Sequence, residues 1–428
     1  GKELNAMRLL WLCNLLPGAI RQAVTGAEGS GLWMDQTLAG LRREEDLELR
    51  LLCRGDTPAA GTAARNLSYY IFPEPTVYRY QQDLEQQFTD QLRAYQPDVI
   101  HIWGTEYGHT LAMLRVCHRL GLLDRTVVSI QGLCSVYARH YAEGIPASVY
   151  WSTTLRDLLR LDNIPAQQRK YVQRGRMELE ALGLARHVIG RTPWDKACTQ
   201  ALAEKAQYHF CNESLREPFY EGQWRLGACR KHRIFASSLE TPIKGFHYLL
   251  EALTQVLRRY PDATLAVPGR SFFPPDPKAA LKQQTYHRYL CRYARAHGLE
   301  GKIEFLGFLS PEDMKREFLQ SHVFALPSTV ENSPNALGEA MLLGVPCVAA
   351  HVGGVSTLLK DREEGFLYPS TEPLLLASAI CRVFDMEEGA ASLGQAAQAH
   401  AQVTHDPEAN LRILRSIYDR LQKGAKEP

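Results

Sequence analysis

Short apolar runs alternate along the whole chain with longer segments of helical periodicity. This alternation is typical of βαβ units, whose strands form a parallel sheet covered on both faces. In the first half the runs predict strands at 9–13, 47–53, 68–72, 98–104, 126–132 and 187–190. The rhythm then restarts and predicts strands at 233–238, 263–269, 303–308, 323–328, 346–350 and 365–369. The pattern therefore predicts an α/β chain with two Rossmann-like, doubly wound parallel-sheet domains.

The domain boundary is predicted in the polar and aromatic stretch 212–224, which has neither the strand nor the helix period. We therefore place an N-terminal domain at 1–215 and a C-terminal domain at 216–405. The last segment, 406–428, contains a helix long enough to return to the N-terminal domain. Residues 132–182 are longer than an ordinary crossover and are expected to be an insertion of the N-terminal domain. Such an insertion often serves a site or a surface, and a helical hairpin that only packs is the equal alternative.

Composition excludes several classes of function. The chain has 428 residues and a formal net charge of +2, so it lacks the basic excess of a protein that coats nucleic acid. Its ten cysteines show no CxxC pair, which favours reduced thiols in a cytosolic protein over a zinc site or a disulfide framework. The start at Met7 fits a first strand better than a signal peptide. No run reaches the roughly 18–20 apolar residues that span a bilayer, so we expect at most peripheral membrane contact, at the inner face of the plasma membrane.

The stretch ENSPNALGEAMLLGVP, residues 331–346, predicts a helix directly after a buried strand at 323–328. Ser333 is expected to be the N-cap and Pro334 to lie in the first turn, so the helix spans roughly 334–343. The free amides at its start would be those of Asn335, Ala336 and Leu337. A helix N-terminus at the carboxyl end of a parallel strand is suited to bind an anion. Glu331 and Glu339 then need an explanation, because carboxylates repel phosphates.

Several motifs answer that question through a resemblance. They are KGFHYLLEAL (244–253), IEFLGFL (303–309), LPSTVENSPNALGEAMLLGVPCVAA (326–350), the pair Gly353 and Gly354, GFLYP (365–369) and YDRL (418–421). In this order they resemble the retaining, GT-B-fold nucleotide-sugar glycosyltransferases of family 4, over most of 232–421. The N-terminal half resembles the family only in its rhythm and in PDVIHIWG (97–104). The resemblance implies a GT-B fold, with two domains that face each other across a cleft.

The resemblance also implies a role for each glutamate. A nucleotide sugar carries hydroxyl groups on both sides of its diphosphate, and carboxylates accept hydrogen bonds from hydroxyls. Glu331 would accept from the transferred sugar and Glu339 from the ribose, while the helix amides take the diphosphate. Lys244 would neutralise the diphosphate as the sugar departs. Glu331 and Lys244 are thus the expected catalytic residues, and Glu339 and Ser333 belong to the expected donor site.

Further donor contacts come from glycine-rich loops and one cation. Gly307 and Phe308 would lie against the base, Gly353 and Gly354 against the phosphates, and Gly29 and Gly31 would approach the donor from the N-terminal domain. Where the family usually has an arginine, this chain has Ser237 and Ser238. The second cation is therefore open between Arg270 and Arg191.

Candidates on the acceptor side lie at the ends of the predicted N-terminal strands. They are His101, Glu106 and Gln131, with His109 nearby. Gln131 stands where many relatives have a histidine, and a glutamine cannot act as a base. A retaining mechanism fits this residue, because the departing phosphate oxygen takes the proton of the acceptor.

These expectations describe a glycosyltransferase that moves a sugar, with retention, from a nucleotide diphosphate donor, UDP-linked by expectation. The acceptor would be a saccharide or a lipid-linked molecule of surface or capsular polysaccharide synthesis. No DxD motif stands at a predicted strand end and no metal-spaced cluster occurs, so neither a metal nor a cofactor is expected. Two alternatives stay open: a GT-B-fold sugar-nucleotide epimerase, and a two-domain sugar-binding protein without catalysis.

Overall fold

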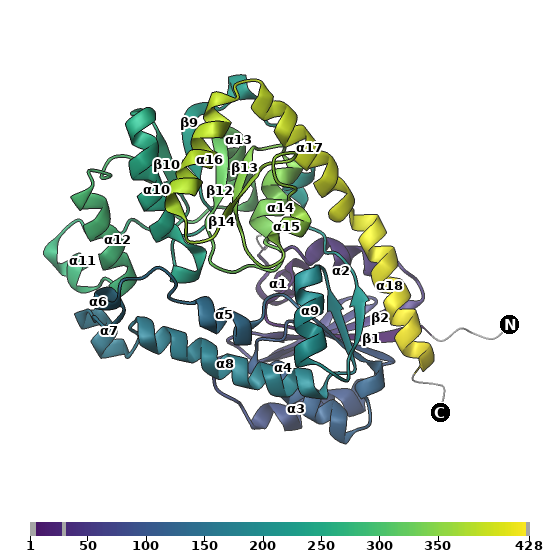
Figure 1. Ribbon diagram of the computed structural model, residues 1–428. Coiled ribbons are helices and arrows are strands. Elements are labelled where there is room, and N and C mark those ends of the chain that lie inside the picture. The colour runs from purple at the N-terminus through teal and green to yellow at the C-terminus, as the bar shows by residue number, and fades with distance from the viewer. Residues whose placement is uncertain (1–5, 28–30, 425–428) are drawn as a thin grey trace. The chain divides into compact units, whose positions relative to one another are not determined.

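The computed structural model describes residues 6–27 and 31–424. The expected donor residue Gly29 lies outside this range. The chain divides into two compact units: unit 1 is 1–136, 171–217 and 405–428, and unit 2 is 137–170 and 218–404. Each unit contains one sheet (Figure 1). We describe the units one at a time.

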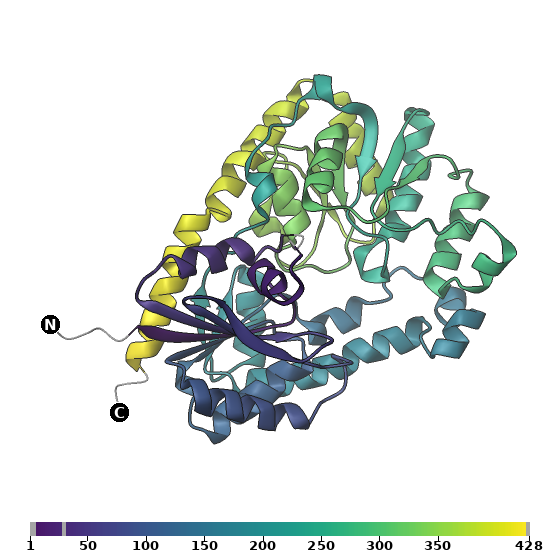
Figure 2. The ribbon, with the colours of Figure 1, turned by 180° about the vertical axis from the view of Figure 1, so that it is seen from behind.

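The sheet of unit 1 has eight strands in the order β3-β4-β2-β1-β5-β6-β7-β8. Only β3 runs antiparallel to its neighbour among the described strands. The strands are β1 (Met7–Cys13), β2 (Leu47–Arg54), β3 (Ala59–Ala64), β4 (Leu67–Phe72), β5 (Val99–Trp103), β6 (Thr126–Ser129), β7 (His187–Gly190) and β8 (Gln207–Phe210). The helices are α1 (Gly18–Thr25), α2 (Asp35–Arg42), α3 (Asp83–Tyr95), α4 (Gly108–Arg119), α9 (Pro193–Leu202) and α18 (Pro407–Gly424). Seen from behind, the strands form a twisted fan (Figure 2).

Both faces of this sheet are buried, which explains why its strands are continuous apolar runs. Successive side chains of a strand point to opposite faces. Leu10 and Leu12 of β1 therefore join one core cluster, and Leu9 and Trp11 join the other. The second cluster includes α18, whose Tyr418 hydroxyl accepts a hydrogen bond from Trp11 Nε1 at 3.0 Å. Helix α18 therefore packs on the sheet that contains β1.

The sheet of unit 2 has six parallel strands in the order β11-β10-β9-β12-β13-β14. They are β9 (Arg230–Phe235), β10 (Thr264–Val267), β11 (Ile303–Phe305), β12 (Ser321–Leu326), β13 (Cys347–His351) and β14 (Phe366–Pro369). The helices are α6 (Ala147–Tyr150), α7 (Leu155–Arg160), α10 (Phe246–Arg259), α11 (Pro277–Leu281), α12 (Thr285–Ala296), α13 (Pro311–Gln320), α14 (Asn335–Leu342), α15 (Val355–Leu358), α16 (Pro373–Asp385) and α17 (Gly389–Thr404). This strand order is that of a Rossmann domain, and every residue of the central β12 is buried. The prediction of two doubly wound parallel sheets is confirmed.

Two strands were missed because neither has an apolar run. β3 consists of small residues, AAGTAA, and lies at one edge of the sheet of unit 1. β8, QYHF, is short, lies at the other edge and is half exposed. Edge strands are buried on fewer sides, so their sequences carry a weaker signal.

The expected insertion differs from the structure in its domain assignment. Residues 137–170 group with unit 2, not with the N-terminal domain. Hydrogen bonds explain this: Thr329 Oγ1 donates to the carbonyl of His140 at 3.0 Å, and the carbonyl of Glu143 lies 2.9 Å from Nε2 of His247. Helices α5 (Cys134–His140) and α8 (Ile164–Leu184) contain the points where the chain passes between the units.

Among the helices in the described ranges, none combines the length and the apolar character that a membrane span requires.

Candidate active site

Lys244 and Glu331 meet at the carboxyl end of the sheet of unit 2. Lys244 lies after β9 and Glu331 after β12, and these two strands are neighbours. The strand order reverses between them, which is where open α/β sheets bind ligands. Lys244 Nζ donates to Oε1 of Glu331 at 2.7 Å. The two expected catalytic residues are therefore in direct contact.

A close approach of two loops produces this contact. Gly245 has φ of 68°, and a Cβ there would lie 1.8 Å from the carbonyl oxygen of Pro327. The amide of Thr329 donates to the carbonyl of Ile243 at 2.8 Å, which joins the same two loops. Only glycine fits at position 245, because any side chain would push the loop of Lys244 away from that of Glu331.

Glu331 is oriented by a residue that the sequence analysis missed. Ser328 Oγ donates to Oε1 of Glu331 at 2.8 Å, the same oxygen that Lys244 contacts. Within the described residues, Oε2 of Glu331 receives no hydrogen bond. The side chain is buried, so this oxygen is a directed acceptor for a ligand hydroxyl. Ser328 precedes Glu331 by three residues, and this short spacing in one loop is the sequence feature that could have indicated their contact.

Helix α14 begins one residue later than predicted. It runs from Asn335 to Leu342, and Pro334 is its N-cap with φ −67° and ψ 121°. Ser333 is therefore not the N-cap, because the extended backbone of Pro334 lies between it and the helix. The amides at the start are those of Asn335, Ala336 and Leu337, which have no partner one turn earlier in the helix. Glu339 lies one turn inside this helix and is buried.

The glycine pair lies beside the loop of Glu331. The amide of Gly354 donates to the backbone carbonyl of Glu331 at 3.2 Å. Gly353 has φ of 49°, in the left-handed region that glycine adopts at little cost. The pair thus turns the chain after β13 toward the two reactive side chains.

Arg270, Gly307 and Phe308 lie at the same carboxyl edge, on the other side of β9. Gly269 and Gly307 exchange backbone hydrogen bonds of 2.8 and 3.1 Å in an isolated bridge, which joins the loops after β10 and β11. Arg270 is exposed, and the side chain of Phe308 is 89% exposed, available to a ligand rather than to the core. Along the edge, the order is therefore the Phe308 loop, Arg270, Lys244, Glu331 and the glycine pair.

The corresponding edge of unit 1 carries Glu106. It lies after β5, whose neighbour β1 marks the reversal of strand order in that sheet. Arg174 Nε donates to the carbonyl of Glu106 at 3.1 Å, and its Nη2 lies 3.8 Å from the carboxylate. Burial raises the pKa of Glu106, and Arg174 opposes that rise. The carboxyl group is thus held in place and is a weaker acid than usual.

Gln131 and Arg191 meet at Glu213, which the sequence analysis did not single out. Gln131 Nε2 donates to Oε1 of Glu213 at 2.6 Å, and Arg191 Nη1 donates to Oε2 at 3.0 Å. Arg191 is 5% exposed and is already paired, so it is unsuited to be the second phosphate cation. Arg270 is the remaining candidate of the two. Glu213 lies in the stretch 212–224, which was interpreted as a domain boundary and was therefore not searched for site residues.

His101, an expected acceptor-side residue, is fully buried. It lies inside β5 with no exposed surface, and its two ring nitrogens contact the hydroxyls of Tyr418 and Ser129. Burial lowers its pKa to about 3, so it stays neutral. His109 is also fully buried and contacts Glu74 at 2.6 Å. His101 lies in the middle of β5, and its side chain points toward Tyr418 of α18. The sequence analysis placed it near the end of the predicted strand and therefore near a site.

The remaining expected donor residue in the described range is Gly31. Gly31 is exposed, with nothing near a Cβ placed on it. The residues that the structure describes contain no group of three or more His, Cys, Asp or Glu side chains arranged to hold a metal ion.

Comparison with known proteins adds to this geometry. Residues 230–400 match the family model "Glycosyl transferases group 1". The chain is 29% identical over 192 residues to the putative glycosyltransferase YtcC of Bacillus subtilis, covering 44% of this chain and 45% of that protein. It is 30% identical over 129 residues to the amylovoran biosynthesis glycosyltransferase AmsK of Erwinia amylovora, covering 29% and 32%. The chain thus matches less than half the length of these relatives.

Solved structures resemble nearly the whole chain. Sucrose-phosphate synthase from Thermosynechococcus elongatus has a TM-score of 0.70 at 17% identity, and 97% of this chain and 99% of that one are covered. HepE of Anabaena in complex with UDP-glucose has a TM-score of 0.63 at 20% identity, with 96% and 100% covered. Identities this low establish the fold alone. The chain therefore has the GT-B fold, and within it residues 230–400 are similar to the glycosyl transferases group 1.

Proposed function

We propose that the chain is a retaining glycosyltransferase that moves a sugar from a nucleotide diphosphate donor to a saccharide or lipid-linked acceptor. The observation that carries this proposal is the contact of Lys244 and Glu331 at the switch point, beside the open amides of α14. A cation and a helix N-terminus suit a diphosphate, and a buried carboxylate suits sugar hydroxyls.

The donor would lie along the carboxyl edge of the sheet of unit 2. The base takes the end near Gly307 and Phe308, and the ribose hydroxyls donate to Glu339. The diphosphate accepts hydrogen bonds from the amides of α14 and from Lys244. The transferred sugar then donates to Oε2 of Glu331. Each charged hydrogen bond of this kind contributes on the order of 1.5–3 kcal/mol.

Retention follows if both bond changes occur on one face of the sugar. The bond from the anomeric carbon to the phosphate oxygen breaks, and the oxygen of the acceptor hydroxyl bonds to the same face. The acceptor proton passes to the departing phosphate oxygen. Lys244 stabilises the charge that develops on the phosphate, so no protein base is required. The residues on the acceptor side would then orient the hydroxyl, which suits Gln131 and Glu106.

The identity of the donor and the pathway rest on similarity. HepE, which shares the fold, is seen in complex with UDP-glucose, and AmsK is named for amylovoran biosynthesis. We infer a UDP-linked donor and a role in surface polysaccharide assembly at the cytoplasmic side of the membrane. Neither a metal nor a cofactor takes part in the proposed step.

One experiment separates this proposal from its rivals. The chain is incubated with UDP-glucose and a panel of saccharide acceptors, and products are followed by NMR. We expect release of UDP and a glycoside with the anomeric configuration of the donor. An inverted product would refute retention. Formation of an epimeric sugar nucleotide would favour an epimerase, and binding without turnover across a wide donor panel would favour a sugar-binding protein.

A further inference from the structure

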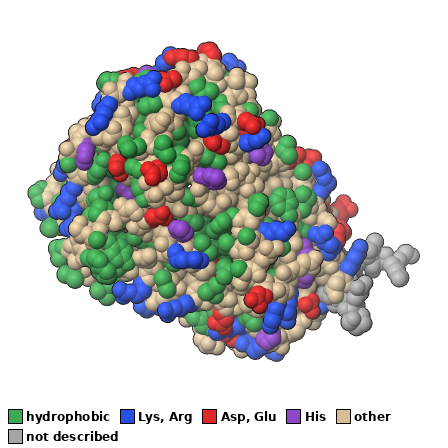
Figure 3. All heavy atoms as spheres, in the orientation of Figure 1, with side chains coloured by type: hydrophobic (Ala, Val, Ile, Leu, Met, Phe, Trp, Pro, Cys, Tyr) green, Lys and Arg blue, Asp and Glu red, His purple; other side chains and the backbone are tan. Residues whose placement is uncertain are grey.

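Residues 151–161 expose a set of large apolar side chains that unit 2 does not cover. Their exposed fractions are 74% for Trp151, 50% for Leu155, 60% for Leu158, and 77% each for Leu159 and Leu161. We call these five side chains the α7 patch. In Figure 3, hydrophobic side chains gather at the left over α6 and α7, with Lys and Arg side chains near them. So dense an exposed apolar group on one short segment indicates a contact surface.

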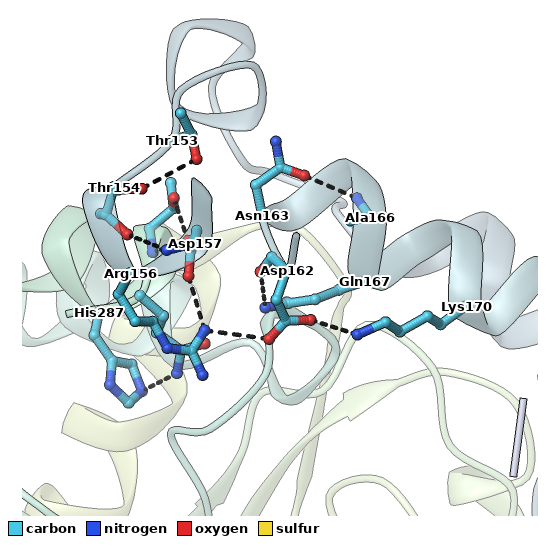
Figure 4. A network of polar contacts seen from close by, with 12 residues as sticks. Thr153, Thr154, Arg156, Asp157, Asp162, Asn163, Ala166, Gln167, Lys170 and His287 are labelled. Atoms are coloured by element: carbon cyan, nitrogen blue, oxygen red, sulfur yellow. Dashed lines mark hydrogen bonds and ion pairs between the residues drawn. The ribbon is translucent and has the colours of Figure 1, made fainter. Parts of the chain in front are cut away.

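The other face of α7 is held firmly by polar contacts. Asp157 is 1% exposed, and its Oδ2 accepts from the amide and the hydroxyl of Thr285 at 2.7 and 2.6 Å. Thr154 caps the helix by accepting from the amide of Asp157 at 3.1 Å. Figure 4 shows Arg156 between Asp157 and Asp162, to which it donates at 2.7 and 3.1 Å. These contacts fix α7 on α12, and the leucines on its other face are therefore held in an exposed position.

Leu161 adds a second observation. It ends α7 in the left-handed region, with φ of 51°. For a residue with a Cβ this conformation costs roughly 1–2 kcal/mol, and glycine or asparagine is the usual choice. With its side chain 77% exposed, Leu161 gains little packing within the chain to offset that cost. A contact outside the chain would account for a leucine at this position.

Charge around the patch favours an anionic surface. The one acid of the segment, Asp157, is buried and pairs with Arg156, and the next residue, Asp162, pairs with Arg156 and with Lys170 Nζ at 2.7 Å. Arg160 is exposed. On α12, Arg288 donates to the carbonyl of Thr153 at 3.3 Å, and the exposed Arg292 follows one turn later. The apolar patch is therefore bordered by cations.

We propose that the α7 patch docks the protein on an anionic lipid bilayer. The leucines would enter the boundary of the acyl chains, Trp151 would lie at the level of the headgroups, and the arginines would meet lipid phosphates. A protein partner fits less well, since a standard interface takes about 20–30 residues on each side. This inference does not rest on the proposed transfer reaction, because binding to lipid needs no nucleotide sugar.

Two tyrosines near the α7 patch do not belong to it. Tyr141 is 2% exposed and donates to Gln167, and Tyr150 donates to Gln168 at 2.7 Å. Trp151, by contrast, is 74% exposed, and its ring packs edge-on against that of Tyr150, with the ring centroids 4.9 Å apart. The leucines, which sequence analysis passed over, form most of the patch.

Co-sedimentation of the full chain with vesicles tests the proposal. The wild type should bind vesicles of phosphatidylglycerol and phosphatidylcholine, and bind pure phosphatidylcholine much more weakly. The double variant Leu159→Ser/Leu161→Asn should lose at least about tenfold in binding. Asparagine tolerates the left-handed backbone, so Leu161→Asn alone keeps the fold and should still weaken binding severalfold. A matched control is Leu374→Ser/Leu375→Ser on α16, where the exposed fractions are 60% and 46%; it should bind like the wild type.

Three results would overturn the proposal. The first is wild-type binding to anionic vesicles by Leu159→Ser/Leu161→Asn. The second is equal loss in the α16 control, which would mean that any exposed leucine matters. The third is a wild-type dimer in sedimentation velocity, without vesicle binding, that the double variant dissociates; the patch would then serve a second copy of the chain.

Discussion

The two sheets share the order of six parallel strands but present different chemistry at their carboxyl ends. At the switch point of unit 2, Lys244 pairs with the buried carboxylate of Glu331, and the first amides of α14 and the exposed Arg270 add further positive charge. The edge of unit 1 holds two ion pairs, Glu106 with Arg174 and Glu213 with Arg191. The strand order therefore determines where a ligand binds, and the loop residues determine which ligand binds.

This difference is the basis on which we propose where each substrate binds. An edge with an ammonium group and free amides suits a diphosphate. An edge of paired charges and an amide side chain suits the hydroxyl groups of a neutral sugar, which need donors and acceptors but no net charge. We therefore propose the donor for unit 2 and the acceptor for unit 1, and the predictions below test this contrast.

The largest effect is expected for Lys244→Gln. This variant removes the charge that stabilises the departing phosphate but keeps a hydrogen-bond donor, so transfer should slow by about 10²–10³-fold. Steady-state assays of UDP release measure it. The control is Lys360→Gln, an exposed lysine that pairs with Glu363 in the same unit. Wild-type rates for Lys244→Gln would contradict the charge assignment at this edge.

Gly245→Ala should destabilise the protein strongly. The new Cβ would overlap the Pro327 carbonyl at 1.8 Å and would hold alanine at φ of 68°. We expect a loss of about 3 kcal/mol or more in the free energy of unfolding, measured with urea. Gly298→Ala is the matched control: φ is also 68° but no atom lies within 4 Å, so it should cost only about 1 kcal/mol. Equal losses would show that the two loops have room to separate.

A smaller effect is expected for Glu106 in unit 1. Because burial raises its pKa, the folded state binds the proton more tightly than the unfolded state does. The stabilisation is present below the ordinary pKa of the carboxyl group and is lost as the pH rises through the raised value. Relative to Glu106→Gln, the wild type should therefore lose stability as the pH rises over that range. Parallel pH profiles of the two proteins would show that Glu106 is not perturbed.

No effect is expected from chelation. If Lys244 and the amides of α14 carry the charge of the diphosphate, excess EDTA should leave the transfer rate unchanged. Loss of activity that magnesium or manganese restores would assign the charge to a metal ion instead.

The sequence predicted one unit better than the other for physical reasons. Buried parallel strands are unbroken apolar runs, so all the predicted strands exist, while the edge strands β3 and β8 lack that signal. The motifs pointed to both Lys244 and Glu331, but their direct contact was not predicted. The first turn of α14 was misplaced by one residue, because both Ser333 and Pro334 occur at helix starts.

The rest depended on contacts between distant residues. The burial of His101 is set by Tyr418 at the far end of the chain, and the partner of Gln131, Glu213, lies in a segment without periodicity. Likewise, the segment 137–170 joins unit 2 through contacts such as Asp157 with Thr285. No local pattern encodes such contacts, so the sequence could not predict them.

The central claim is that the carboxyl edge of the C-terminal sheet holds the nucleotide, and calorimetric titration of UDP tests it most directly. Glu339→Ala should weaken UDP binding by roughly 1–3 kcal/mol, through loss of its bond to the ribose, and Glu251→Ala on the exposed face of α10 should not. Wild-type affinity in a folded Glu339→Ala variant would contradict the claim and remove this edge as the donor site.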